Sequence, residues 1–195
     1  MTFKEVLEKY RAISFTEKEK GTKFERLMRL WLLTDPRYER LTQVWMWNDF
    51  PSRKDFGGSD IGIDLVAKEE NGNYWAIQCK CYKEESRIDK KEVDSFLATS
   101  SKQFLDPETM QTVGFSNRLW ISTTNNWGSN AEEAIRHQNP PVSRIGLVDL
   151  ETSPVDWEKL EEGLSGSSAR AEGKQPMKHQ LNAISKAVEH YKENH

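Results

Sequence analysis

The chain has 195 residues, which is the size of one ordinary domain with an extension, and it can bury a core without disulfides or metals. Hydrophobic residues make up 36% of it, with seven tryptophans and eight phenylalanines, which excludes an intrinsically disordered protein. The 31 acidic and 28 basic residues give a net charge of −3, unlike the basic balance of a free-standing nucleic-acid-binding domain.

The N-terminal residues carry charges throughout and contain no apolar segment of the signal-peptide type. No run of the sequence is long and apolar enough to span a membrane. The two cysteines, Cys79 and Cys81, are too few for a disulfide framework, and no set of Cys and His residues has the spacing of a zinc site. These features predict a cytoplasmic protein with reduced thiols and no membrane partner.

Two helices are predicted at the start of the chain. The first is amphipathic, with apolar residues at helical spacing: Phe3, Val6, Leu7 and Tyr10. The second begins near Thr22, which Glu25 follows three residues later in a capping-box pattern, and runs to Leu33. Asp35-Pro36 ends it.

The rest of the main domain alternates between strands and helices. Strands are predicted over 41–50, 61–68, 74–82, 117–124 and 143–150. Helices are predicted after Asp89, with Glu92 completing its cap, and after Ser129, with Glu132 behind it and Pro140-Pro141 beyond its end. This order predicts an α/β fold with a mixed central sheet, parallel strand pairs and helices on both faces.

The composition changes near residue 161. Residues 161–175 are small, polar and rich in Gly and Ser, which predicts a linker after a main domain of residues 1–160. Residues 176–195 then begin a fresh helix with Pro176 in its first turn.

Polar residues interrupt two of the apolar strands. Alternation in the strand 74–82 places Gln78 and Lys80 on one face, with α-carbons about 6.5–7 Å apart. Whether Asp64 joins them depends on the turn between the strands. A two-residue turn, Asn71-Gly72, puts Asp64 on the opposite face, whereas a three-residue loop with Gly72 in the left-handed region puts Asp64 opposite Gln78. We expect the three-residue loop or an equivalent bulge.

These residue types suit the cleavage of phosphodiester bonds. An Asp oxygen and a neighbouring carbonyl-type oxygen hold a hard divalent cation such as Mg²⁺, with waters completing its coordination. Such a cation activates water and stabilises charge on a phosphate, and a nearby lysine stabilises the transition state. An Asp followed by Gln-x-Lys on a hairpin is therefore a candidate nuclease site.

The segments "GGSDIGIDLVA", "YWAIQCKCY" and the following "EV" resemble the Mrr-like branch of the PD-(D/E)xK nucleases. The resemblance implies a restriction-endonuclease-like core in which Asp64, Gln78 and Lys80 are catalytic. It implies that metal is held by Asp64, by Gln78, by the backbone carbonyl of Cys79 and in part by Glu25. Mg²⁺, or Mn²⁺ in its place, is the implied cofactor, and double-stranded DNA is the implied substrate.

The stretch "KQPMKHQLNAISKAVEHY" is similar to the junction between nuclease and motor in single-polypeptide type I (type ISP) restriction enzymes. This similarity implies that 176–195 begins a helicase-like ATPase. It also implies a methyltransferase in the same polypeptide, with ATP and S-adenosylmethionine used by those modules, and a second enzyme copy for double-strand cleavage.

Several alternatives remain open at this point. Asp64 can be a turn residue, Gln78 and Lys80 an exposed polar face, and Glu25 a capping residue. Asp60 is interpreted as a turn residue. Trp45 and Trp47 share a face and are expected to pack in the protein rather than to stack on bases.

Four basic residues near the site either contact DNA phosphates or form a solvated surface: Lys83, Arg87, Lys90 and Lys91. Two other functions compete with that of a restriction nuclease. One is a Holliday-junction-type resolvase, although such proteins are usually basic. The other is a non-cleaving DNA-binding module of the same fold.

Overall fold

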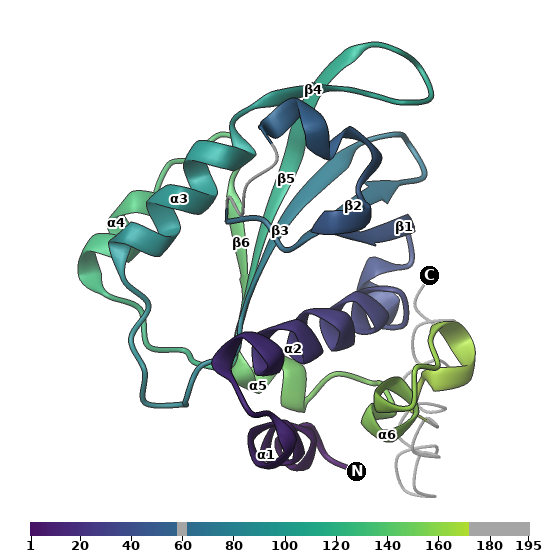
Figure 1. The fold of residues 1–195 in the computed structure, drawn as a ribbon, viewed down its shortest axis with the longest axis vertical. Coiled ribbons are helices and arrows are strands. Elements are labelled where there is room, and N and C mark those ends of the chain that lie inside the picture. The colour runs from purple at the N-terminus through teal and green to yellow at the C-terminus, as the bar shows by residue number, and fades with distance from the viewer. Residues whose placement is uncertain (58–61, 172–195) are drawn as a thin grey trace, which may run out of the picture.

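A mixed sheet runs through the middle of the chain, in a computed structural model that describes residues 1–57 and 62–171 (Figure 1). In the described part the sheet has six strands: β1 Leu41–Met46, β2 Leu65–Glu69, β3 Tyr74–Lys80, β4 Gln103–Leu105, β5 Thr112–Ser122 and β6 Val142–Ile145. β1, β2 and β3 are antiparallel neighbours, β5 lies parallel to β3 and β6, and β4 pairs antiparallel with β5. The predicted mixed sheet with parallel pairs is confirmed.

Helices cover both faces of this sheet. They are α1 Phe3–Ile13, α2 Glu17–Leu32, α3 Lys90–Ser100, α4 Ser129–Ile135, α5 Leu147–Glu151 and α6 Trp157–Glu161. Short 3-10 helices span Pro36–Tyr38, Trp47–Asp49, Pro51–Phe56 and Gly166–Ala169. α1, α2, α5 and α6 pack on one face, and α3 and α4 pack together on the other (Figure 1). None of the described helices is long and apolar enough to cross a membrane.

Two apolar cores result from this arrangement. The first lies under α2 and contains the buried side chains of Phe24, Trp31 and Ile77. The second lies under α3 and is largely aromatic. Its rings include Trp47, Phe50, Phe56, Tyr74, Phe96, Phe104, Phe115 and Trp120. Trp45 packs against this core as well, so both tryptophans of β1 and its extension pack inside the protein, as expected.

The β2–β3 hairpin has the predicted three-residue loop. The Gly72 N–H donates to the Glu69 carbonyl at 2.9 Å, and the Glu69 N–H donates to the Asn73 carbonyl at 2.9 Å. Gly72 has a φ of +86°, in the left-handed region that favours glycine. Leu65 therefore pairs with Ile77, and the residue before Leu65 falls opposite Gln78.

The second helix begins earlier than predicted. Thr16 is the N-cap of α2, and its hydroxyl accepts a hydrogen bond from the Glu19 N–H at 3.0 Å. The Glu19 carboxylate accepts a hydrogen bond from the Phe15 N–H at 3.0 Å. Thr16 and Glu19 therefore cap the helix, a role that the sequence analysis assigned to Thr22 and Glu25. Glu25 consequently lies in the helix interior and is not a capping residue.

Other boundaries also differ from the prediction. β1 ends at Met46, where a 3-10 helix follows, β2 begins only at Leu65, and β5 begins at Thr112. Gly128, not Ser129, is the N-cap of α4. Strand β6 ends at Ile145, and the rest of the predicted strand 143–150 forms α5. The reason lies at Gly146, whose N–H donates to the Asp149 carboxylate at 2.9 Å and opens a helix there.

The first part of the predicted linker is folded onto the domain. The Gly166 N–H and the Arg170 guanidinium donate to the hydroxyl and the carbonyl of Thr34, each at 3.0 Å, and Ala169 is fully buried. The folded region therefore continues to residue 171. Residues 172–175 and the helix expected at 176–195 lie outside the described residues, so the division into nuclease domain, linker and ATPase start stays a prediction.

A buried arginine anchors the end of α3. Arg118 on β5 is 2% exposed and donates to the Ser101 hydroxyl at 2.7 Å and the Pro140 carbonyl at 2.9 Å. Burial lowers the pKa of its guanidinium. Ser101 is the C-cap of α3, where the negative end of the helix dipole stabilises a cation. This contact fixes α3 relative to the sheet.

We predict that Gly72→Val lowers the free energy of unfolding by about 1–2 kcal/mol, because a β-branched residue is strained at positive φ. Gly72→Asn is the matched control, since Asn tolerates this region, and we expect a smaller loss. Urea denaturation measures both. Equal stability of Gly72→Val and the parent would contradict the loop conformation.

Candidate active site

Asp64 is held by the backbones of three residues on two segments. Its N–H donates to the Ile77 carbonyl at 2.9 Å, and its carbonyl accepts from the Trp47 N–H at 2.7 Å. These bonds continue the pairing of the sheet one residue beyond the start of β2. The Asp64 carboxylate is therefore placed by the main chain, and its Oδ2 accepts the Cys79 N–H at 2.7 Å.

Gln78 lies directly opposite Asp64 and is buried, with 3% of its surface exposed. Its Nε2 donates to the Asp64 carboxylate and, at 3.4 Å, to the Cys79 carbonyl. A half-turn of the amide about its last bond exchanges its nitrogen and oxygen. The same side chain can therefore present either a donor or a neutral oxygen ligand beside Asp64.

The backbone of Cys79 faces the same position. Both the Ile77 carbonyl and the Cys79 N–H bond to Asp64, so the Cys79 carbonyl also points toward the β2 side of β3. The Cys79 thiol points to the first core on the opposite face. Burial raises the pKa of this thiol, and the nearby Asp64 and Glu25 carboxylates raise it further.

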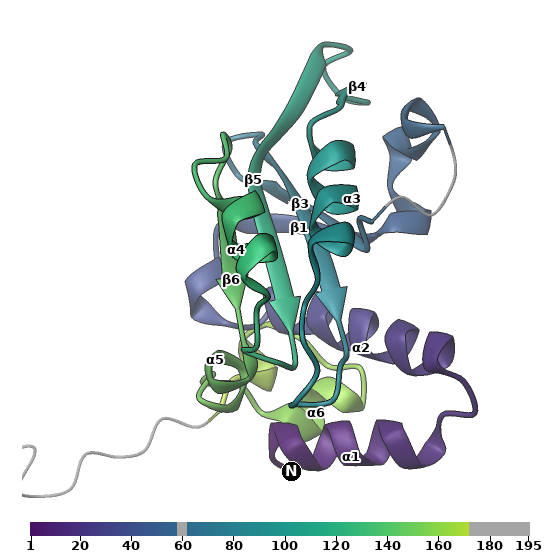
Figure 2. The same ribbon diagram turned by 90° about the vertical axis from the view of Figure 1, so that its left-hand side faces the viewer.

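A cavity of about 330 Å³ opens at this end of the sheet. Glu25 and Gly21 line it from α2, and Asp64 lines it from the start of β2, with Arg53 and Trp47 on the third side. Figure 2 shows β3 and β5 running in the same direction, with their carboxyl ends close to α2. The α2 helix therefore brings Glu25 to the cavity that Asp64 also lines.

Lys80 is the last residue of β3 and lies on the same face of the strand as Gln78. Its Nζ lies 3.4 Å from Glu92 Oε1 on α3, and the Tyr82 hydroxyl donates to the same carboxylate oxygen. Burial, and then the bond to Glu92, raises the pKa of the Tyr82 phenol. The structure thus brings Asp64, Gln78, Lys80 and Glu25 to one end of the sheet, and their catalytic and metal-binding roles stay predictions.

The sequence analysis included Glu92 in the family segment "EV" but assigned it only a capping role, and so missed its contact with the site. The cap itself is present, since Asp89 accepts the Glu92 N–H at 3.1 Å. The Glu92 side chain, however, turns toward Lys80. The available signal was its place in the first turn of the helix that follows the Gln-x-Lys strand.

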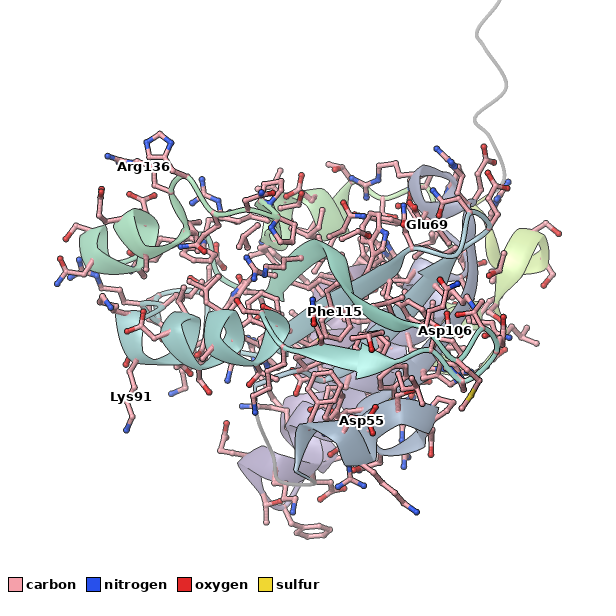
Figure 3. All side chains as sticks on the ribbon, turned by 90° about the horizontal axis from the view of Figure 1, so that it is seen from above. Asp55, Glu69, Lys91, Asp106, Phe115 and Arg136 are labelled. Atoms are coloured by element: carbon pink, nitrogen blue, oxygen red, sulfur yellow. The ribbon has the colours of Figure 1, made fainter. Side chains whose placement is uncertain are left out.

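The four basic candidates for DNA contact lie in the β3–α3 loop and the start of α3, and all are exposed: Lys83, Arg87, Lys90 and Lys91. Lys90 forms an ion pair with Asp94 on the next turn of α3. Lys91 points away from the body of the domain (Figure 3). Their role in DNA binding stays a prediction, and Asp60 lies outside the described residues.

The oxygen atoms at and beside the cavity fit a hard divalent cation. Asp64 and Glu25 line the cavity with their carboxylates, and behind Asp64 lies the Gln78 amide, which bonds both to Asp64 and to the Cys79 carbonyl. The described residues contain no group of three or more His, Cys, Asp and Glu side chains arranged to hold a metal. A set of few carboxylates with neutral oxygens suits Mg²⁺, which keeps several of its waters, better than it suits zinc.

Comparisons with known proteins decide the family. A family model described as "Restriction endonuclease", of the Mrr catalytic type, matches residues 33–167, well over half of the chain. The chain belongs to this restriction endonuclease family. A search of curated proteins gives no match.

Among solved structures, this restriction endonuclease domain is similar to the ATP-dependent type ISP restriction-modification enzyme LlaBIII bound to DNA. The TM-score is 0.68 and the identity 28%, over 99% of this chain but 11% of that enzyme, so the chain spans a small part of its neighbour's length. The modification-dependent restriction endonuclease AspBHI matches with TM-score 0.43 and 16% identity, over 85% of this chain and 35% of its own. The restriction endonuclease MspJI in complex with a 27-mer oligonucleotide matches with TM-score 0.44 and 18% identity, over 75% of this chain and 30% of its own.

We predict that the Cys79 thiol of the folded chain reacts slowly with a disulfide reagent at pH 8. Burial and two nearby carboxylates raise its pKa, so the reactive thiolate is scarce below that pKa. Cys81 is less buried and should react before it, although its pKa is also raised. Thiol release followed with and without urea measures this, with Cys79→Ser as the control. A fast reaction of Cys79 in the folded chain would contradict the geometry.

Proposed function

We propose that this domain cleaves phosphodiester bonds of double-stranded DNA with Mg²⁺ or Mn²⁺, as the nuclease part of a larger translocating restriction-modification enzyme. The observation that carries the proposal is the hairpin register, which puts Asp64 opposite Gln78 and one side-chain repeat from Lys80. The membership of the restriction endonuclease family supports DNA as the substrate.

Each residue has a separate role in this proposal. Asp64, the Cys79 carbonyl and Glu25 from α2 would hold the metal ion, and Gln78 would offer its amide oxygen in the flipped orientation of its side chain. The ion, when bound, lowers the pKa of water and stabilises charge on the phosphate. Lys80 orients the attacking water or stabilises the extra charge that the phosphate gains.

The neutral Gln78 has a consequence for metal affinity. Nucleases of this superfamily usually carry an acidic residue there, as the resemblance implies, so this site has one negative charge fewer. Coulomb attraction to a divalent cation falls accordingly. We therefore propose that the isolated domain binds Mg²⁺ weakly.

The proposal of a larger enzyme draws on the type ISP neighbour. That neighbour is ATP-dependent and bound to DNA, and this chain matches 11% of it. A motor and a methyltransferase in the same polypeptide would use ATP and S-adenosylmethionine, and a second copy would complete a double-strand break. The domain would act in the cytoplasm, where foreign DNA is met.

The two competing functions make different demands. A Holliday-junction-type resolvase would bind branched DNA as an independent dimer, which the net charge of −3 does not favour. A non-cleaving DNA-binding module would not need Asp64, Gln78 and Lys80 in one row, and their alignment favours a nuclease.

We predict that Asp64→Asn and Lys80→Ala each lower DNA cleavage by the full polypeptide at least about 100-fold, since each removes a group that acts on the reacting phosphate. Gln78→Glu should retain cleavage and strengthen Mn²⁺ binding, because it adds a negative ligand. Supercoiled plasmid with ATP is the substrate, and Lys102→Ala, at an exposed position outside the cavity, is the control. Parental cleavage by Asp64→Asn would refute the site.

We predict that the isolated 195-residue chain cuts plasmid DNA negligibly, whereas the motor-linked polypeptide cuts it with ATP. The chain has little uncompensated positive charge for phosphates, and a motor on the same polypeptide raises the local concentration of DNA at the site. The two proteins are titrated side by side with Mg²⁺ or Mn²⁺. Robust ATP-independent double-strand cleavage by the short chain at low concentration would overturn this view.

A further inference from the structure

The Glu92 carboxylate lies close to the site, but Glu92 does not line the cavity and its ion pair is with Lys80 rather than with a group on Asp64. Its position needs an explanation. Glu92 lies in the first turn of α3, forms an ion pair with Lys80 and accepts a hydrogen bond from the Tyr82 hydroxyl. Its side chain is 30% exposed, as is that of Lys80 at 29%, so the ion pair lies at the edge of the site and is partly screened by water. A surface ion pair of this kind contributes little to stability, which points to another role.

Lys80 has a second carboxylate within reach. Asp64 lies opposite Gln78, so it is the diagonal neighbour of Lys80, with α-carbons about 7–8 Å apart. A lysine side chain spans that distance. An ammonium group paired with Asp64 would neutralise the main metal-binding carboxylate and compete with a cation for it.

We propose that Glu92 is a positioning residue that keeps the Lys80 ammonium from pairing with Asp64, the carboxylate that would bind the divalent cation. Glu92 thereby offsets the charge that Gln78 lacks, by acting on the lysine rather than on the metal. This inference rests on the proposed function, because it takes Asp64 as a metal ligand.

The surroundings of Glu92 suit this role. The Tyr82 hydroxyl, on the continuation of β3, holds the carboxylate oxygen that also meets Lys80. Asp89 caps the helix at the Glu92 N–H, and Arg118 fastens the far end of α3 through Ser101. The carboxylate is therefore fixed by its own helix and by a phenol before any ligand arrives.

The test is Mn²⁺ binding to the 195-residue chain, measured as free Mn²⁺ by electron paramagnetic resonance. Glu92→Gln should weaken Mn²⁺ binding about 10-fold or more, the size of effect that a residue acting on a metal ligand has. In a Lys80→Met background, Glu92→Gln should have no further effect, because the competing ammonium is gone. Asp94→Asn is the matched control, with the same charge change on the same helix but an ion pair to Lys90.

Three results would overturn the proposal. The first is that Glu92→Gln binds Mn²⁺ as tightly as the parent. The second is that Asp94→Asn loses as much Mn²⁺ affinity as Glu92→Gln. The third is that Glu92→Gln still lowers Mn²⁺ affinity in the Lys80→Met background. Thermal unfolding of every variant checks folding. If Glu92→Gln does not fold, Tyr82→Phe removes the hydroxyl that holds Glu92 and should weaken Mn²⁺ binding in the same direction.

A second readout needs no metal and separates this inference from the proposed function. The Lys80 side-chain nitrogen signal, assigned by its loss in Lys80→Met, is followed by NMR in the metal-free chain. Adding Asp64→Asn to the parent chain should leave the Lys80 signal unchanged. Adding Asp64→Asn to the Glu92→Gln variant should shift the Lys80 signal, because in that variant Lys80 has moved to Asp64. The absence of that shift refutes the inference. Equal Mn²⁺ binding by the parent and Asp64→Asn would instead refute the metal site.

Discussion

The register of the β2–β3 hairpin is the constraint on which the site depends. The left-handed conformation of Gly72 adds a third residue to the loop, and this sets Leu65 against Ile77. A loop shorter by one residue would turn every side chain of β2 to the other face. Asp64 would then lie in the apolar core under α2, and no acidic group would face Gln78.

The electrostatics of the site follow from that register. Asp64 is bonded to the Cys79 N–H and to Gln78, and Glu25 from α2 lines the same cavity. Lys80 forms an ion pair with Glu92 on α3, which packs on the face of the sheet opposite to α2. The site is thus assembled from both layers of helices, and the positions of α2 and α3 matter as much as the strand sequence.

Local signals in the sequence predicted much of the fold. The apolar spacing of α1, the cap at Asp89 and the loop at Gly72 are each set by neighbours within a few residues, and each is confirmed. The start of α2, the helix after Gly146 and the packing of 162–171 on Thr34 were missed. At the start of α2 a second capping pattern competed with the one chosen. At Gly146 the apolar run after the glycine was interpreted as part of a strand, and in the third case a polar, Gly/Ser-rich composition concealed specific hydrogen bonds.

The sequence by itself determined which side chains share a face of β3, because alternation in a strand is fixed by backbone geometry. It also indicated the family, through Asp64, Gln78 and Lys80. Only the tertiary structure decided the task of the two glutamates on helices. Glu25 and Glu92 both looked like capping residues. A capping pattern depends only on the residues within one helical turn, so it does not predict which distant side chain or cavity a glutamate will face. Packing of α2 and α3 on the sheet directs one to the cavity and the other to Lys80.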